Sequence, residues 1–355
     1  MDYRFKLGLM LADSLADWKS QLRRRFKRAP EVLLDLLSVL CIPFALRFAL
    51  QLRRFHRRIA EVGFGAASRE LLERYYAEVV FSAEDGPAAE NLAAQGPVLV
   101  LANHPGVVDS LALMWALETR LGITDFLVVA NERDFFKAMP RVRERIIPVP
   151  SLASDRAAVF ARMEAALAAG ISVVLYPSGD ITNDPGLAPD IYSFDDLLGV
   201  WSPSVGLLIA RARRWAKTGG RLTVLPLICG GVLPPRSADA KWMGSNRSRR
   251  EREALAVISI LAFGAGKRAT VAVCAGRPLD CERDLAGLSP KELGAAVYRR
   301  AAEAAEALAR ELGSGEGFQT PSAKRARTAP SYAANVLVRE TAASAASAPP
   351  TEGPR

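Results

Sequence analysis

From Pro97 onward the chain alternates short apolar, β-branched runs with segments of helical periodicity. This alternation constrains the fold more than any other feature, because strands separated by helices build a largely buried sheet covered by helices. The predicted strands are Val98–Ala102, Phe126–Ala130, Ile146–Val149, Ser172–Tyr176, Leu222–Ile228 and Ala269–Ala275. The predicted helices are Ser110–Leu121, Asp155–Ala169, Ser204–Ala216 and Pro290–Leu312. We therefore expect an α/β fold with a largely parallel or mixed sheet flanked by helices.

The charge of the chain is concentrated near its N-terminus. The 355 residues include 47 Lys and Arg against 38 Asp and Glu, a formal net charge of +9. Residues 1–60 hold 13 basic and 5 acidic residues, a net charge of +8, whereas residues 61–313 have a net charge of −1. A protein that binds nucleic acid over its surface usually has a basic body. We therefore expect no nucleic-acid partner.

The basic N-terminal part also contains a short apolar stretch. Its uncharged core, Leu36–Leu46, has eleven residues, and as a helix it would rise about 16 Å, roughly half the hydrocarbon thickness of a bilayer. We expect it not to span a membrane. Arginines on both sides favour an amphipathic helical hairpin at an anionic membrane surface. The same hairpin could instead pack on the body, and the sequence leaves both alternatives open.

Histidine and cysteine are scarce. The two histidines, His56 and His104, are too few for a multi-histidine metal site, and the cysteines form no C-x-x-C pair, so we expect no metal. Four cysteines in mostly apolar surroundings are typical of buried free thiols in a reducing compartment. They are Cys41, Cys229, Cys274 and Cys281.

The stretch VLVLANHPGVVDSLAL, Val98–Leu113, places polar residues directly after a predicted strand. Ligands and reactive groups of α/β folds gather at such strand ends. His104 lies there with Asp109 five residues later, and a carboxylate beside imidazole fixes its tautomer and stabilises the imidazolium. Asp109 could equally cap the following helix. The pair alone therefore leaves a catalytic and a structural role open.

Three blocks along the chain resemble those of the PlsC-like glycerolipid acyltransferases, the lysophosphatidic acid type. Asn103 with the run from His104 to Asp109 resembles the motif N-H-x-x-x-x-D. The Tyr-Pro-x-Gly sequence within Val173–Thr182 resembles the family block F-P-E-G-T-R, and Val224–Gly231 resembles the fourth block. The order and spacing of these blocks carry the resemblance.

This resemblance implies an O-acyltransferase of phospholipid biosynthesis, similar to 1-acylglycerol-3-phosphate O-acyltransferases. The acyl donor would be acyl-CoA or acyl carrier protein, the acceptor a hydroxyl of a lysophosphatidic-acid-like lipid, and no cofactor would be needed. His104 would be the general base and Asp109 would orient it. The protein would be peripheral, on the cytoplasmic face of the inner membrane. Residues 1–60 would be membrane-association helices, 61–313 the acyltransferase domain, and 314–355, rich in Ala, Ser, Pro and Thr, a disordered tail.

The third block departs from the family pattern. Ser178 stands where the family has Glu, and Asp180-Ile181 where it has Thr-Arg. Because those family residues help to hold glycerol phosphate, other acceptors stay open: glycerol-3-phosphate, a larger lysophospholipid or an amino-acid lipid. A non-catalytic lipid-binding relative is a further alternative. Asp180 would be either a displaced carboxylate or a turn residue.

The second block falls within Asn131–Arg156, but its arginine is not defined by the sequence. A guanidinium binds phosphate through two parallel hydrogen bonds, so Arg141, Arg143, Arg145 and Arg156 are candidates. The predicted substrate-binding residues are Asn103, Arg145, Arg156, Tyr176, Pro177, Ser178, Gly179 and Asp180.

Overall fold

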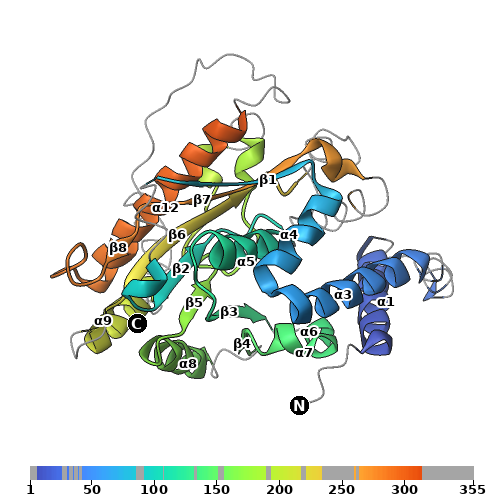
Figure 1. The fold of residues 1–355 in the computed structure, drawn as a ribbon, viewed down its shortest axis with the longest axis horizontal. Helices are drawn as coiled ribbons and strands as arrows, with labels where there is room; N and C mark the ends of the chain where they lie inside the picture. The colour runs from blue at the N-terminus through green and yellow to red at the C-terminus, as the bar shows by residue number, and fades with distance from the viewer. Residues whose placement is uncertain are drawn as a thin grey trace, which may run out of the picture.

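The structure is a computed structural model that describes residues 6–25, 30–31, 35, 39, 42–84, 92–106, 108–131, 134–150, 156–188, 193–216, 221–233, 260 and 264–313. These residues form one eight-stranded sheet in the order β1-β7-β6-β2-β5-β3-β4, with β8 beside β6 (Figure 1). The strands are β1 (Glu78–Ala83), β2 (Val98–Ala102), β3 (Phe126–Asn131), β4 (Ile146–Val149), β5 (Ser172–Leu175), β6 (Thr223–Gly230), β7 (Thr270–Ala275) and β8 (Leu279–Asp280).

The sheet is mixed. Strand β2 runs parallel to both β5 and β6, and β3 runs parallel to β5 and β4. Strand β1 is parallel to β7, whereas β7 and β8 are antiparallel to β6. The predicted α/β fold is therefore confirmed. Strand β1 was not predicted, because it is a half-exposed edge strand whose partner β7 comes near the other end of the described chain.

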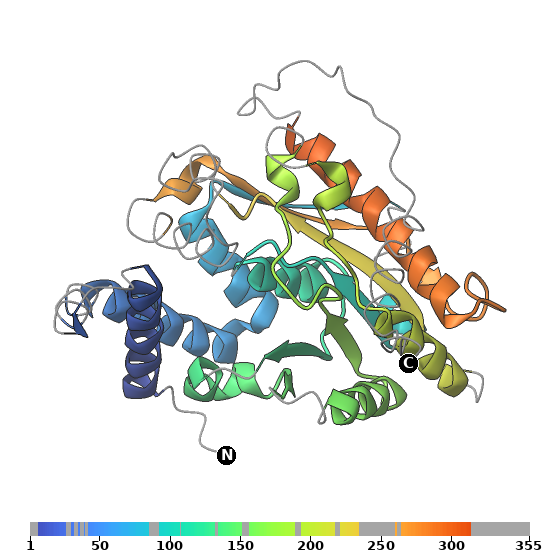
Figure 2. The same cartoon turned by 180° about the vertical axis from the view of Figure 1, so that it is seen from behind.

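Helices cover both faces of the sheet. One face carries α4 (Phe64–Tyr75) and α5 (Asp109–Thr119), and the other carries α8 (Arg156–Ala168), α9 (Ser204–Ala216) and α12 (Pro290–Gly313), as Figures 1 and 2 show. Helices α1 (Leu7–Arg25), α3 (Ile42–Val62), α6 (Asp134–Ala138) and α7 (Pro140–Arg143) lie beyond the first face. Short 3₁₀ helices are η2 (Leu92–Gln95), η4 (Pro185–Leu187), η5 (Phe194–Asp196) and η7 (Ala265–Arg268).

Strand β2 lies at the centre of the sheet and is buried on both faces. Val98, Val100 and Ala102 enter one core cluster, while Leu99 and Leu101 enter the other. All five are fully buried, and burial of each larger side chain stabilises the fold by roughly 1.5–3 kcal/mol. The residues that follow Ala102 therefore begin from a rigid support.

The N-terminal helices pack on each other and on the body. Helix α1 contacts α3 and α6, and α3 contacts α4. Ala45 and Ala49 of α3 are buried, as is Met10 of α1, so small side chains allow the helices to approach closely. Most residues that connect the two helices lie outside the described part of the chain, so the predicted hairpin stays a prediction.

Three other predictions stay open as well. The predicted disordered tail, 314–355, lies wholly outside the described residues, as do Cys41 and four other residues of the apolar core Leu36–Leu46. The division at residues 60 and 313 is not tested. Within the described residues, no helix is both long and apolar enough to cross a membrane.

Candidate active site

His104 lies two residues beyond the end of β2, at the edge where β5 and β6, the parallel neighbours of β2, also end. Its Nδ1 is 2.7 Å from Oδ2 of Asp109. The His104 side chain is 32% exposed, whereas that of Asp109 is fully buried. A buried carboxylate at Nδ1 accepts the ring N–H there, so the lone pair of the neutral imidazole is on Nε2. The arrangement fixes the orientation of the ring through Nδ1 and makes Nε2 its basic nitrogen.

Asp109 contacts both the imidazole and the first turn of α5, in which Val108 is the N-cap residue. Asp109 is the first residue of α5, and its Oδ1 accepts a hydrogen bond from the backbone N–H of Ser110 at 2.5 Å. Its Oδ2 faces His104. The amino end of a helix stabilises a carboxylate by about 0.3–1 kcal/mol or more when partly buried. The helix start therefore holds the same charge that orients the imidazole.

Tyr176 follows β5 and places its ring beside that of His104. The ring centroids are 4.9 Å apart and the planes are tilted by 41°. Burial raises the pKa of Tyr176 well above its usual value, and the nearby Asp109 carboxylate raises it further. The phenol is therefore neutral and packs against the imidazole. Pro177, next along the chain, accepts a hydrogen bond from the backbone of Ser202 through its carbonyl oxygen at 3.0 Å.

Residues Ser178 to Asp180 form an exposed turn beside this ring pair. Gly179 has φ = 62°, a left-handed conformation that glycine adopts without steric cost. The Ser178 hydroxyl donates to the Asp180 carbonyl at 2.7 Å. Oδ1 of Asp180 accepts from the backbone of Ile181 at 2.9 Å. Both side chains thus stabilise the turn, and Asp180 has the geometry of a turn residue.

Asn103 directs its amide into the sheet. Its Nδ2 donates to the carbonyl of Cys229 and its Oδ1 accepts from the N–H of Cys229, both at 2.8 Å. Asn103 is only 1% exposed. The side chain therefore continues the pairing of β2 with β6 beyond Ala102, rather than facing a substrate as predicted.

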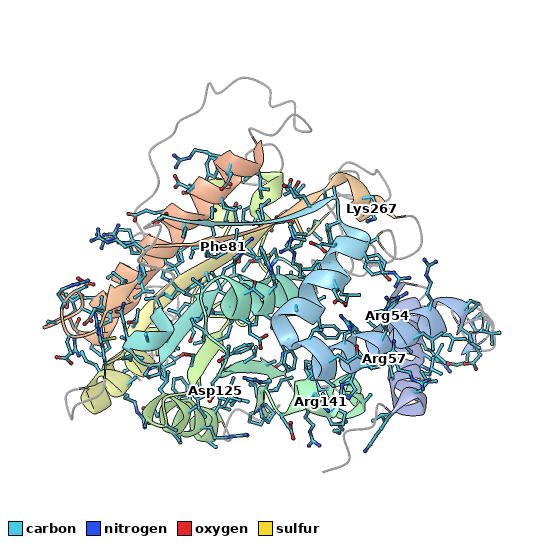
Figure 3. The ribbon with its side chains drawn as sticks, in the orientation of Figure 1. Arg54, Arg57, Phe81, Asp125, Arg141 and Lys267 are labelled. Atoms are coloured by element: carbon cyan, nitrogen blue, oxygen red, sulfur yellow. The ribbon has the colours of Figure 1, made fainter. Side chains whose placement is uncertain are left out.

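Arg145 does not lie at the His104 end of the sheet. It precedes β4 and donates to the carbonyl of Thr124 at 2.9 Å, next to Asp125 (Figure 3), where β3 begins. Its guanidinium also lies 5.1 Å from the ring centroid of Phe126. Since β3 and β4 are parallel to the strands that lead to His104, their beginnings lie at the opposite edge of the sheet. The structure therefore does not bring Arg145 to the His104 end of the sheet.

The other candidate arginines remain less defined. Arg156 begins α8, after β4 has ended, but its side chain lies outside the described part of the structure. Arg141 and Arg143 belong to α7, which precedes β4 as Arg145 does.

Two buried polar residues at the site were not predicted. The Thr182 hydroxyl accepts from the His104 N–H at 3.0 Å, and the Thr182 N–H donates to the His104 carbonyl at 2.7 Å. Asp184 is fully buried and accepts from the N–H groups of Gly186, Gly231 and Leu233 at 2.7–2.8 Å. The run Thr-Asn-Asp before Pro-Gly was the available signal, because such side chains readily bond to backbone.

Across the described ranges, no three side chains of His, Cys, Asp or Glu lie close enough together to hold a metal ion. The polar groups of the site are the imidazole, two carboxylates and hydroxyl groups, which suit proton transfer.

Residues 88–218 match the sequence model of the acyltransferase family. The match supports the resemblance to acyltransferases, and it includes the first two of the three blocks, Asn103–Asp109 and Val173–Thr182. Among solved structures, the chain is similar to the 1-acyl-sn-glycerophosphate acyltransferase PlsC from Thermotoga maritima, with 12% identity and a TM-score of 0.38, over 86% of this chain and 98% of that one. A search of curated protein sequences gave no match.

Proposed function

We propose that this protein is a lipid O-acyltransferase that moves a fatty acyl group from acyl-CoA or acyl carrier protein to a hydroxyl of a lysophosphatidic-acid-like acceptor. The observation that carries the proposal is the contact of 2.7 Å between Nδ1 of His104 and the buried carboxylate of Asp109. The family match over residues 88–218 supports acyl transfer as the class of reaction.

In the proposed step, Nε2 of His104 takes the proton from the acceptor hydroxyl while its oxygen attacks the thioester carbonyl carbon. Asp109 stabilises the imidazolium that forms, because the carboxylate is already buried beside Nδ1. The tetrahedral intermediate then expels the thiolate, which takes the proton back from Nε2 as the C–S bond breaks. The products are an ester and a free thiol, without a metal or a cofactor.

The N-terminal helices support a peripheral membrane location. Ile42, Leu46 and Leu50 follow each other at intervals of four in α3, so they share one face, and all three are exposed. Arg54 and Arg57 follow in the same helix, and α7, which carries Arg141, contacts α3 (Figure 3). An apolar stripe next to cations suits the boundary of an anionic bilayer. We propose that this surface docks the enzyme, on the cytoplasmic face, where its lipid acceptor lies.

A second candidate keeps the reaction and changes the acceptor. Ser178 has no carboxylate and Asp180-Ile181 have no guanidinium, and both Ser178 and Asp180 bond within their own turn. The groups that the family block would bring to glycerol phosphate are therefore not found at the same positions. This favours testing glycerol-3-phosphate, a larger lysophospholipid and an amino-acid lipid beside lysophosphatidic acid.

The reaction is tested with purified protein, acyl-CoA or acyl carrier protein, and that panel of acceptors. We expect release of free thiol together with an acylated lipid, and loss of both in His104→Ala. His56→Ala removes the only other histidine, which lies in α3, and serves as the control. Full turnover by His104→Ala would refute the mechanism, and vesicle binding with no transfer to any acceptor would point to a non-catalytic lipid-binding relative.

A further inference from the structure

The segment that follows the third block contains three consecutive polar residues, Thr182, Asn183 and Asp184. All three are less than 10% exposed, although the segment belongs to no helix or strand. Buried polar groups without regular pairing are costly unless each finds a partner. The hydrogen-bond partners of these three side chains therefore indicate the role of the segment.

Each of the three residues bonds to a different part of the site. Thr182 bonds to His104, and Asn183 donates from Nδ2 to the carbonyl of Asp196 in η5 at 3.1 Å. Asp184 bonds to the chain just beyond β6, at Gly231 and Leu233. The segment thus joins the loop after β2, the loop that follows β5 and the end of β6.

Thr182 contacts the backbone of His104 through two hydrogen bonds. One residue, Thr182, engages both the backbone N–H and the backbone carbonyl of His104, at 3.0 and 2.7 Å. Asp109 holds the ring at Nδ1. Backbone and ring are therefore fixed by two different residues, and the position of Nε2 depends on both.

Asp184 holds Thr182 in turn. Its carboxylate gathers N–H groups from both sides of the segment, since Gly186 follows it in the chain while Gly231 and Leu233 come after β6. The approach is close: a Cβ on Gly186 would lie 2.8 Å from the nitrogen of Gly231. A side chain at Gly186 would push the segment away from the chain just beyond β6, and with it Thr182.

We propose that Thr182, anchored by Asp184, is a positioning residue that sets the reach of His104 towards the acceptor hydroxyl. The expected change in kcat rests on the proposed acyl transfer, whereas the expected change in the position of the His104 ring does not. Thr182 touches no reacting atom. It acts through the backbone of His104, while Asp109 acts through the ring.

The test compares Thr182→Val, which keeps the shape and removes the hydroxyl, with Thr182→Ser, which restores it. Because a misplaced base of about 1 Å slows turnover by about 100-fold, we expect Thr182→Val to lower kcat by about 10- to 100-fold with KM for the acceptor nearly unchanged. Thr182→Ser should recover most of kcat. Thr223→Val changes another buried threonine, at the start of β6, and should leave both constants unchanged.

A spectroscopic readout separates this proposal from the proposed function. With only two histidines, selective ¹⁵N-histidine labelling in a His56→Ala background reports the tautomer of His104 alone. We expect wild type to show Nδ1 protonated and Nε2 unprotonated, and Thr182→Val to shift both nitrogen signals towards a mixture. Signals that stay unchanged, or a kcat that stays unchanged in an active enzyme, would overturn the proposal.

If wild type transfers no acyl group, the proposed function is refuted. The ¹⁵N signals of the His104 ring still test whether Thr182 positions the imidazole. If Thr182→Val does not fold, Thr182→Ala removes the hydroxyl without burying a second methyl group in its place, and it is read in the same way. Asp184→Asn should move the ring signals in the same direction as Thr182→Val.

Discussion

The His104 end of the sheet and the N-terminal helices differ in whether their charged side chains are buried or exposed. At the sheet end, Asp109 and Asp184 are fully buried and matched by an imidazole and by backbone N–H groups. In α3, Arg54 and Arg57 are exposed, and so is Leu46. Buried, prearranged charge acts strongly on a reacting group, whereas exposed charge acts weakly but on any anionic surface. The first region suits chemistry and the second suits attachment, so changes in one should leave the other property intact.

The largest effect that would sharpen this comparison is expected from Asp109→Asn. The amide keeps the shape but no longer favours the tautomer with Nε2 unprotonated, so kcat should fall by about 10²- to 10⁴-fold. Binding to anionic vesicles, measured by sedimentation, should not change. Asp125→Asn, at the opposite edge of the sheet and with a side chain 73% exposed, is the matched control. Loss of vesicle binding in Asp109→Asn would break the separation of the two regions.

The sequence predicted the His104 end of the sheet better than its surroundings. His104, Asp109 and Tyr176 follow strands whose apolar runs are unmistakable, and parallel strands bring their carboxyl ends together. The backbone partners of Asn103 and Asp184 were not predictable, because Cys229 and Gly231 become neighbours only through the pairing of β2 with β6. A side chain that bonds to distant backbone leaves no periodic signal.

Arg145 shows the complementary failure. Its type and its place in the second block suggested phosphate binding, but the expected sheet was largely parallel or mixed, so the sequence did not reveal at which edge of the sheet the strand Ile146–Val149 begins. Here β4 begins at Ile146, so Arg145 lies at the edge remote from His104.

A second effect concerns the buried carboxyl of Asp184. Burial raises its pKa from 3.8 to about 6, although the backbone N–H groups of Leu233, Gly186, Gly231 and Val232 act in the opposite direction. Between about pH 6 and pH 4 the folded protein therefore binds a proton that the unfolded chain does not, so this group alone adds up to about 3 kcal/mol of stability as the pH falls. Above pH 6 that contribution is absent.

The measurement is the difference in unfolding free energy between wild type and Asp184→Asn, by urea titration at about pH 7.5 and about pH 4.5. The unfolding free energy of wild type minus that of the variant should be larger at the lower pH than at the higher pH. A difference that moves the other way would mean that the backbone N–H groups outweigh burial. A ¹³C titration of the carboxyl in wild type checks the same point without a variant.

A smaller effect is expected for attachment. Each cation near an anionic surface contributes about 1 kcal/mol, so Arg54→Gln with Arg57→Gln should weaken binding to anionic vesicles by about 30-fold at low salt, and less at high salt. Turnover on a detergent-dispersed acceptor should be unchanged. Arg283→Gln with Arg299→Gln removes two exposed arginines near β8 and in α12, on the far side of the molecule from α3 (Figure 1). Equal weakening by both pairs would show that net charge, not the N-terminal surface, drives binding.

The smallest effect is expected from Arg145→Gln, which tests the opposite edge of the sheet. The variant loses the hydrogen bond to the carbonyl of Thr124 and the stacking of the guanidinium on Phe126, so the unfolding free energy should fall by about 1 kcal/mol. Because the guanidinium caps the start of β3 rather than reaching a substrate, kcat and KM for the acceptor should match wild type. A rise of KM for phosphorylated acceptors alone would return Arg145 to the binding site and would require the chain before β4 to move towards His104.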